Sequence, residues 1–213
     1  MKITVCAVLA LSLALSTLCA QDDPLSTPET KKLAKGAVEL GWQYFKKGNY
    51  ETALRRFEMA TRRDKSFAPG YYGMAYVYSV QGKLDDAIKY YRESLKYDQT
   101  YPYTYANLGY ALLQKEQYDE ALKMLDKALK LDPKCGEAHL SYANYYAYKE
   151  EWKKAEASAN KAIECGQKLH PEFRKLLEKN GAQLKAEPGG AANGSQPMRS
   201  ETNQTSSAAG SRR

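Results

Sequence analysis

The stretch PYTYANLGYALLQKEQYDEALKMLDKALKLDPKC, residues 102–135, predicts the fold of this chain. Apolar residues recur along both of its halves at steps of three and four, which is the spacing of an amphipathic helix. The pair Glu116-Gln117 lies between the halves and indicates a short turn. We therefore expect two antiparallel helices within 34 residues.

The same pattern returns when the sequence is shifted by 34 residues. One position holds alanine in every copy, namely in Ala53, Ala87, Ala121 and Ala155. A large residue recurs three positions earlier, in Tyr50, Leu84, Tyr118 and Trp152. The small residues let two helices approach closely, whereas the large ones fill the space toward the next pair. Because one helical pair cannot bury its apolar face alone, the copies predict a stacked solenoid.

The repeat resembles the tetratricopeptide repeat family. The resemblance within residues 102–135 rests on Tyr105, Leu108, Gly109, Tyr118, Ala121, Ala128 and Pro133. It implies an all-α fold, a right-handed solenoid of helical hairpins with a C-terminal capping helix. The repeats are expected at 34–67, 68–101, 102–135 and 136–169. The fourth departs most from the family pattern, with Ala159 in an aromatic position and His139 at the first large position.

The regions outside the repeats have other compositions. Residues 21–33 are expected to form a linker and a helix start at Thr27-Pro28-Glu29-Thr30, so the first helix begins before its repeat. Residues 170–184 are expected to form the capping helix, with Phe173, Leu176 and Leu177 on one apolar stripe. The tail 185–213 is rich in Gly, Ala, Ser and Asn, which predicts disorder.

Residues 1–20 have the pattern of a signal peptide. Lys2 precedes an apolar run that is short for a membrane span, and Ala20 is a small residue before a polar stretch. This predicts an exported protein, periplasmic or secreted, that is not transmembrane. A lipid anchor on Cys19 is the alternative, although Leu18 stands where bacterial lipoproteins have a small residue.

Charge and motifs exclude several classes of function. The chain has 32 Lys+Arg against 25 Asp+Glu, a net charge of +7, but both signs are interspersed along the repeats. We therefore expect no nucleic-acid partner. Walker, zinc-protease, nucleophile-elbow and Rossmann motifs are all missing from the sequence, so we expect neither catalysis nor a cofactor.

Two cysteines flank the helices of the fourth repeat. Cys135 precedes the first helix and Cys165 ends the second, so antiparallel helices bring them to the same end. In an oxidising compartment this favours a Cys135–Cys165 disulfide. Two buried free thiols are an alternative, and a metal site that adds His139 and His170 is another.

The resemblance also implies where a partner binds, because proteins of this family usually bind partners on the concave face, along the first helix of each repeat. Carried over position by position, the expected groove residues are Trp42, Phe45, Tyr72, Tyr76, Tyr103, Asn107, Tyr110, Asn144 and Tyr148. A clamp for a C-terminal carboxylate is not expected, because only Asn107 fits its pattern. The 18 tyrosines favour instead an aromatic groove for a protein or peptide segment.

Within this groove Trp42, Tyr76 and Tyr110 are the expected aromatic anchors, and Asn107 and Asn144 the expected hydrogen-bonding groups. Binding of a glycan or cell wall and self-assembly into a homo-oligomer are the alternative functions. The same rings could also serve only to pack the repeats together. Tyr118 falls in a core position by this alignment, and Tyr145 fits neither the core nor the groove.

Overall fold

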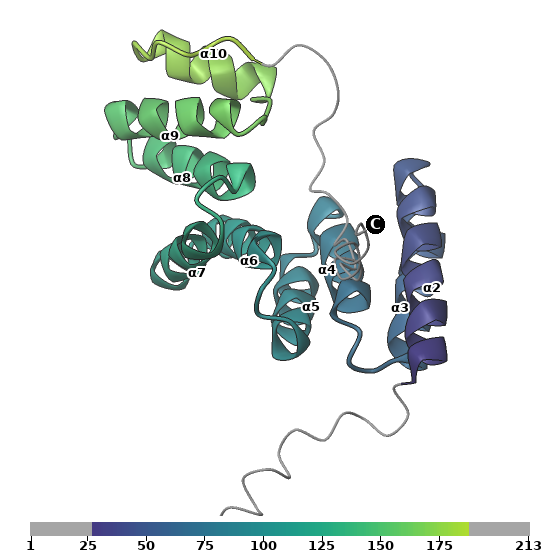
Figure 1. Ribbon diagram of the computed structural model, residues 1–213. Helices are drawn as coiled ribbons and strands as arrows, with labels where there is room; N and C mark the ends of the chain where they lie inside the picture. Colours follow the sequence, from purple (N-terminus) through teal and green to yellow (C-terminus); the bar gives the residue numbers. More distant parts are fainter. Residues whose placement is uncertain (1–26, 188–213) are drawn as a thin grey trace, which may run out of the picture.

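The structure is a computed structural model that describes residues 27–187, and this part of the chain forms only helices (Figure 1). The helices are α2 (Pro28–Lys46), α3 (Tyr50–Arg63), α4 (Ala68–Val80), α5 (Leu84–Tyr97), α6 (Pro102–Gln114), α7 (Tyr118–Leu131), α8 (Gly136–Tyr148), α9 (Trp152–Glu164) and α10 (Pro171–Lys179). The first eight form four hairpins that stack in chain order, which confirms the predicted all-α solenoid. The predicted signal peptide and most of the predicted tail lie outside the described residues.

The first helix starts where the sequence predicts. Thr27 accepts a hydrogen bond from the Thr30 amide at 3.2 Å, and the Thr30 hydroxyl accepts one from the Thr27 amide at 2.9 Å. These two bonds satisfy amides that a helix N-terminus leaves without partners. Pro28 occupies the first turn, where its fixed φ suits a helix.

The turn within each hairpin needs one residue with positive φ. Gly48 and Gly82 supply it in the first two hairpins, at φ values of +74° and +73°. Glu116 and Glu150 take the same place in the last two, at +60° and +58°. Glycine adopts this conformation readily, whereas a side chain with a Cβ atom is strained there.

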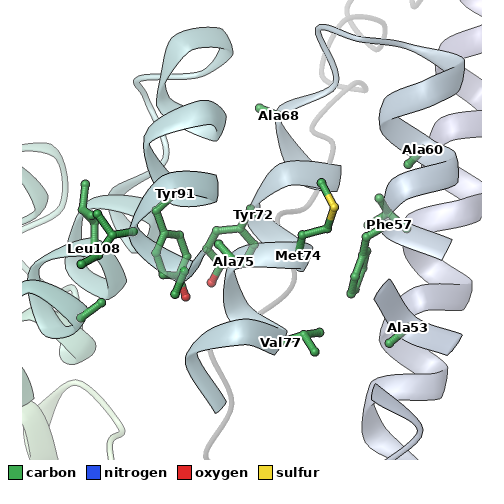
Figure 2. Packing of buried hydrophobic residues seen from close by; sticks show 14 of the residues in the cluster. Ala53, Phe57, Ala60, Ala68, Tyr72, Met74, Ala75, Val77, Tyr91 and Leu108 are labelled. Carbon is green, nitrogen blue, oxygen red and sulfur yellow. The ribbon is translucent and has the colours of Figure 1, made fainter. Parts of the chain in front are cut away.

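The core is built from small residues that admit a large neighbour. The alanine of every repeat is fully buried, in Ala53, Ala87, Ala121 and Ala155. Phe57, also fully buried, lies against two glycines: a Cβ atom would come within 2.6 Å of its ring at Gly41 and 2.4 Å at Gly73. Figure 2 shows Phe57, Met74, Tyr72, Tyr91 and Leu108 in this core. The absence of a side chain at Gly41 and Gly73 thus makes room for Phe57 between α2 and α4.

The C-terminal end differs from the expected long capping helix. Helix α10 stops at Lys179, because Gly181 adopts φ +87° and the chain turns away. The Gly181 amide donates to the Glu178 carbonyl and the Ala182 amide to the Leu177 carbonyl, both at 3.0 Å. This pattern is a Schellman motif, a common helix stop at glycine.

Residues 182–187 then run back along α9 and α10, and we call this segment the strap. The Asn160 side chain accepts from the Lys185 amide at 2.8 Å and donates to the Gln183 carbonyl at 3.0 Å. Glu187 accepts from the Leu169 amide at 3.1 Å and pairs with Arg174 at 2.9 Å. The first described residues of the predicted tail, 185–187, are therefore held by specific bonds.

Candidate binding groove

The predicted groove residues fall into two groups in the structure. Most of those in the first two repeats are part of one interlocked set of rings. Tyr110 on α6 and Asn144 and Tyr148 on α8 line a hollow that is open to solvent. The two groups differ in burial, and this difference decides which residues a partner can reach.

Four predicted groove residues pack on one another in the first two repeats. The Trp42 ring lies 5.6 Å from Phe45, 6.1 Å from Tyr72 and 5.4 Å from Tyr76, measured between ring centroids. Trp42 is 7% exposed, and Tyr72 is fully buried. Such edge and offset contacts are favourable between aromatic rings. These rings therefore act first as packing between repeats.

Two more predicted groove residues support this packing. The Asn107 amide donates a hydrogen bond to the Tyr72 hydroxyl at 3.0 Å and so ties α6 to α4. Tyr103 lies 5.1 Å from Tyr101, and the Tyr101 ring meets Tyr72 edge-on at 5.5 Å. Burial raises the pKa of Tyr103 to about 12, so its hydroxyl is neutral at physiological pH. The Asn107 amide is thus engaged with the protein itself.

The accessible part of the groove is a hollow of about 320 Å³ between α6, α8 and the turn that leads into α7. We call it the α6–α8 hollow. It is lined by Tyr110, Leu113, Gln114, Glu116, Tyr118, Asn144, Tyr145 and Tyr148. Tyr110 is 37% exposed and Tyr148 is 63% exposed. The structure thus brings three predicted groove residues together: Tyr110, Asn144 and Tyr148.

Polar groups orient two side chains of the hollow. Gln114 donates a hydrogen bond to the Tyr110 hydroxyl at 2.9 Å, which fixes the end of that ring. The Asn144 amide donates to the Leu140 carbonyl one turn earlier, at 2.9 Å. The hollow therefore has a partly fixed lining before any partner binds.

One ammonium group lies against the rings of the hollow. Lys149 Nζ is 4.4 Å from the centroid of Tyr118, 5.4 Å from that of Tyr148 and 6.0 Å from that of Tyr145. A hydrogen bond with Tyr148 is the largest of the causes that raise the pKa of Tyr118 to about 12. The phenol is therefore neutral at physiological pH, and its ring attracts the cation through its face.

Five residues of the hollow are absent from the predicted site: Leu113, Gln114, Glu116, Tyr118 and Tyr145. Tyr118 falls in a core position by alignment, but its side chain is only half-buried. Tyr145 follows Asn144 on α8 and reaches the hollow beside it. Glu116 could have been noticed in the sequence, because it stands where the first two repeats have a turn glycine.

The predicted Cys135–Cys165 disulfide is not formed in this structure, in which both cysteines are free thiols. A Cβ atom on Gly136, the residue after Cys135, would lie 3.3 Å from Cβ of Cys165, so the two helix ends are close together. The buried Cys135 thiol is instead directed at Glu137, with Sγ 4.0 Å from Oε2. Burial raises the pKa of Cys135 to about 12 and also raises that of Cys165.

The alternative metal site is not formed either. Across residues 27–187, no three His, Cys, Asp or Glu side chains are grouped so that they could hold a metal ion. Nε2 of His139 lies 3.0 Å from the Pro133 carbonyl oxygen. Nδ1 of His170 accepts from the Glu172 amide at 3.3 Å and caps α10. Each imidazole thus has a local structural partner.

None of the described helices combines the length and the apolar character needed to cross a bilayer.

Comparison with solved structures shows the same fold elsewhere. A thermophilic TPR protein of Thermus thermophilus is 26% identical, with a TM-score of 0.59 over 69% of this chain and 80% of that one. Pseudomonas aeruginosa pilF is 20% identical, with a TM-score of 0.61 over 71% and 69%. MamA from Desulfovibrio magneticus is 21% identical, with a TM-score of 0.55 over 69% and 82%.

Sequence comparison gives the family itself. A search of curated proteins finds no match. The family model described as "Tetratricopeptide repeat" matches residues 68–101 and 102–135, the second and third hairpins. These boundaries are those of the predicted repeats, and the hairpins before and after them stack in the same way. The second and third hairpins are therefore tetratricopeptide repeats, and solved structures of such proteins share the fold of the chain.

Proposed function

We propose that this protein is an exported, non-catalytic scaffold that binds a segment of another protein in its concave groove. The α6–α8 hollow is the observation that carries the proposal. It presents tyrosine rings to solvent between the first helices of two neighbouring repeats. Tyrosine offers a large contact area and a polar end at a low entropic cost, which suits protein recognition.

The burial of the rings changes the proposed anchors from those expected from the sequence. Trp42 and Tyr72 are enclosed by other rings, so they form the floor of the groove. Tyr110 and Tyr148 are the exposed rings and replace Trp42 as the first contacts. The Trp42 indole Nε1 is buried, and no described residue or group accepts a hydrogen bond from it. A partner that reaches this floor could supply the missing acceptor.

The test starts from peptides selected from a random display library against the wild-type protein. The double variant Tyr110→Ala/Tyr148→Ala should bind them at least tenfold more weakly by fluorescence anisotropy, because aromatic anchors commonly contribute about 2 kcal/mol or more. Tyr97→Ala is the matched control, since Tyr97 is 46% exposed but lies on α5, outside the hollow. Circular dichroism should show unchanged helicity in both variants.

Other outcomes would reject the groove. Equal affinity of the double variant and the wild type would place peptide binding elsewhere. Failure to select any peptide, together with binding on a glycan array that requires Tyr110 and Tyr148, would support the carbohydrate-binding alternative. Concentration-dependent light scattering that is lost in the double variant would support self-assembly through the same rings.

Export is supported by the sequence pattern of residues 1–20. The expected result is a secreted or periplasmic product that lacks this segment, detected by mass spectrometry of the N-terminus. Retention of Met1 in the product would contradict export by cleavage. A lipid on Cys19 would instead identify the anchored form.

A further inference from the structure

We propose that the α6–α8 hollow takes one cationic side chain, a lysine or an arginine, of the bound segment. This inference rests on the proposed function and names the chemistry of its partner. It stands on the rings that line the hollow, on the carboxylate at its edge and on its size.

The rings of the hollow already attract an ammonium. Lys149 Nζ lies within 6.0 Å of the centroids of Tyr118, Tyr145 and Tyr148, the range in which cation–π attraction operates. Lys149 itself does not line the hollow, so its position on these rings leaves the hollow open. Tyr110 adds a fourth ring from α6, on the other wall.

A carboxylate at the edge of the hollow supplies the opposite charge. Glu116 lines it from the turn after α6, and its side chain is exposed. Within the described part of the chain, no lysine or arginine pairs with Glu116, whereas the neighbouring Lys115 pairs with Asp85 at 3.0 Å. A carboxylate beside aromatic faces recognises a guanidinium or ammonium group on a flexible stem.

The size of the hollow fits one side chain. Ligand pockets in proteins span about 300–1,000 Å³, and this hollow is at the lower end of that range. The apolar stem of lysine or arginine would lie along Leu113 and the ring faces, with its charge at Glu116. An acidic side chain would instead face Glu116, and only Lys149 would attract it.

The experiment uses n-butylguanidinium chloride as the probe, with n-butylurea as a neutral analogue of the same shape. Each is titrated into the wild-type protein at constant ionic strength, and amide shifts are followed by NMR. We expect saturable shifts at Tyr110, Tyr145 and Tyr148 with the cation alone. Equal binding of n-butylurea, or no saturable shift with either probe, would overturn the cationic site.

Three variants test whether a negative charge at the hollow strengthens binding of the cation and a positive charge weakens it. Glu116→Gln should weaken binding of the cation about threefold, as expected for an exposed charge pair. Glu150→Gln is the matched control, because Glu150 has the same backbone conformation one repeat later but does not line the hollow. Lys149→Met should tighten binding, since it removes a like charge. Unchanged binding in Glu116→Gln or weaker binding in Lys149→Met would refute the inference.

Failure of this site can be told apart from failure of the groove. Selected peptides that need Tyr110 and Tyr148 but lack a required lysine or arginine would retain the groove and reject the cationic site. Selected peptides that ignore both tyrosines would reject the groove itself.

Discussion

At the scale of single residues, glycines decide how closely the helices of the first two repeats approach. Gly73 lies on α4 against the fully buried ring of Phe57, whereas Gly36 lies on α2 with open space around it. Because both positions lie in helices, comparing an alanine substitution at each separates the effect of packing from the effect of backbone entropy.

Gly73→Ala should lower the free energy of unfolding by about 1–3 kcal/mol, the usual range for an overfilled core. The added Cβ atom would lie 2.4 Å from the Phe57 ring, which cannot move without disturbing its neighbours. Gly36→Ala should raise the free energy of unfolding by about 0.5–1 kcal/mol, because alanine favours a helix. Urea denaturation of both variants checks the pair, and a similar sign for the two would contradict the packing argument.

The turn residues Glu116 and Glu150 have a strained backbone conformation with positive φ. Their positive φ disfavours any residue with a Cβ atom, whereas the aligned Gly48 and Gly82 have none. Glu116→Gly and Glu150→Gly should each stabilise the protein by about 0.5–1 kcal/mol in chemical denaturation. The reciprocal change Gly82→Ala should destabilise it. If both glutamate variants lose stability, their side chains contribute more than the backbone strain removes.

The sequence predicted which position of the repeat each residue occupies, but it did not predict how deeply each side chain is buried. Trp42 occupies a groove position of the repeat, yet Phe57, Tyr72 and Tyr76 close around it. A single alignment column cannot show this, because burial depends on which large residues the adjacent columns carry. Tyr145 was missed for the related reason that it reaches the hollow from beside the expected column.

At the scale of elements, the strap is the feature that the repeat pattern does not contain. Its backbone pairs with Asn160, and its Glu187 pairs with Arg174. The composition of residues 181–213 predicted a flexible tail and did not reveal these polar bonds. The helix stop at Gly181 was not predicted, since the capping helix was expected to reach residue 184, and the return of the chain onto α9 depends on partners far away in sequence.

The strap should detach in acid. The hydrogen bond from Arg174 holds the pKa of Glu187 below its ordinary value of 4.5. Its stabilising contribution is therefore complete above about pH 4.5 and is lost as the pH falls through the lowered pKa. The hydrogen-exchange protection factors of the Leu169 and Lys185 amides, each taken relative to the intrinsic rate at the same pH, should fall in that acidic range.

Glu187→Gln should lower these protection factors already at pH 7 and remove most of their pH dependence. Glu164 also pairs with Lys185 and has a lowered pKa, so the double variant Glu187→Gln/Glu164→Gln controls for its share. A protection factor of the Leu169 amide that stays constant across this pH range in the wild type would show that the ion pair does not hold the strap.

At the scale of the whole molecule, the core is divided into neighbouring clusters along the stack. One extends from α2 to α7, one joins α6 and α7 to α8, and one lies between α8 and α10. In such a solenoid each repeat contacts only its neighbours, so stability is a sum of local terms. Damage at one end should therefore remain near that end.

Leu177→Ala should test this locality. Leu177 is fully buried in the last cluster, and its truncation should cost about 2–5 kcal/mol. Hydrogen exchange should rise in α8, α9 and α10 while α2 to α4 keep their protection. Leu176→Ala is the control, because this neighbour is 43% exposed and should change stability by at most about 0.5 kcal/mol. Uniform loss of protection would indicate one cooperative unit.

The 34-residue period was enough to predict the number, order and pairing of the described repeat helices. The alanine column follows from local pattern, and the alanine is buried in every repeat. The lining of the hollow was predicted only in part, since Tyr110, Asn144 and Tyr148 meet there while Trp42 does not. Which side chains reach the surface depends on how deeply their neighbours bury them, and the 34-residue period does not contain this information.

The strap also gives the stack a polarity for assembly. It is bonded to α9 and α10, where Leu176 stays 43% exposed, whereas at the α2–α3 end Leu33 is 45% exposed and lines an open depression. Two copies that met through their α2–α3 ends would use identical surfaces and form a closed, two-fold symmetric pair. Head-to-tail growth would require the α9–α10 end to receive the α2–α3 end. The strap therefore makes the two ends of the stack different surfaces.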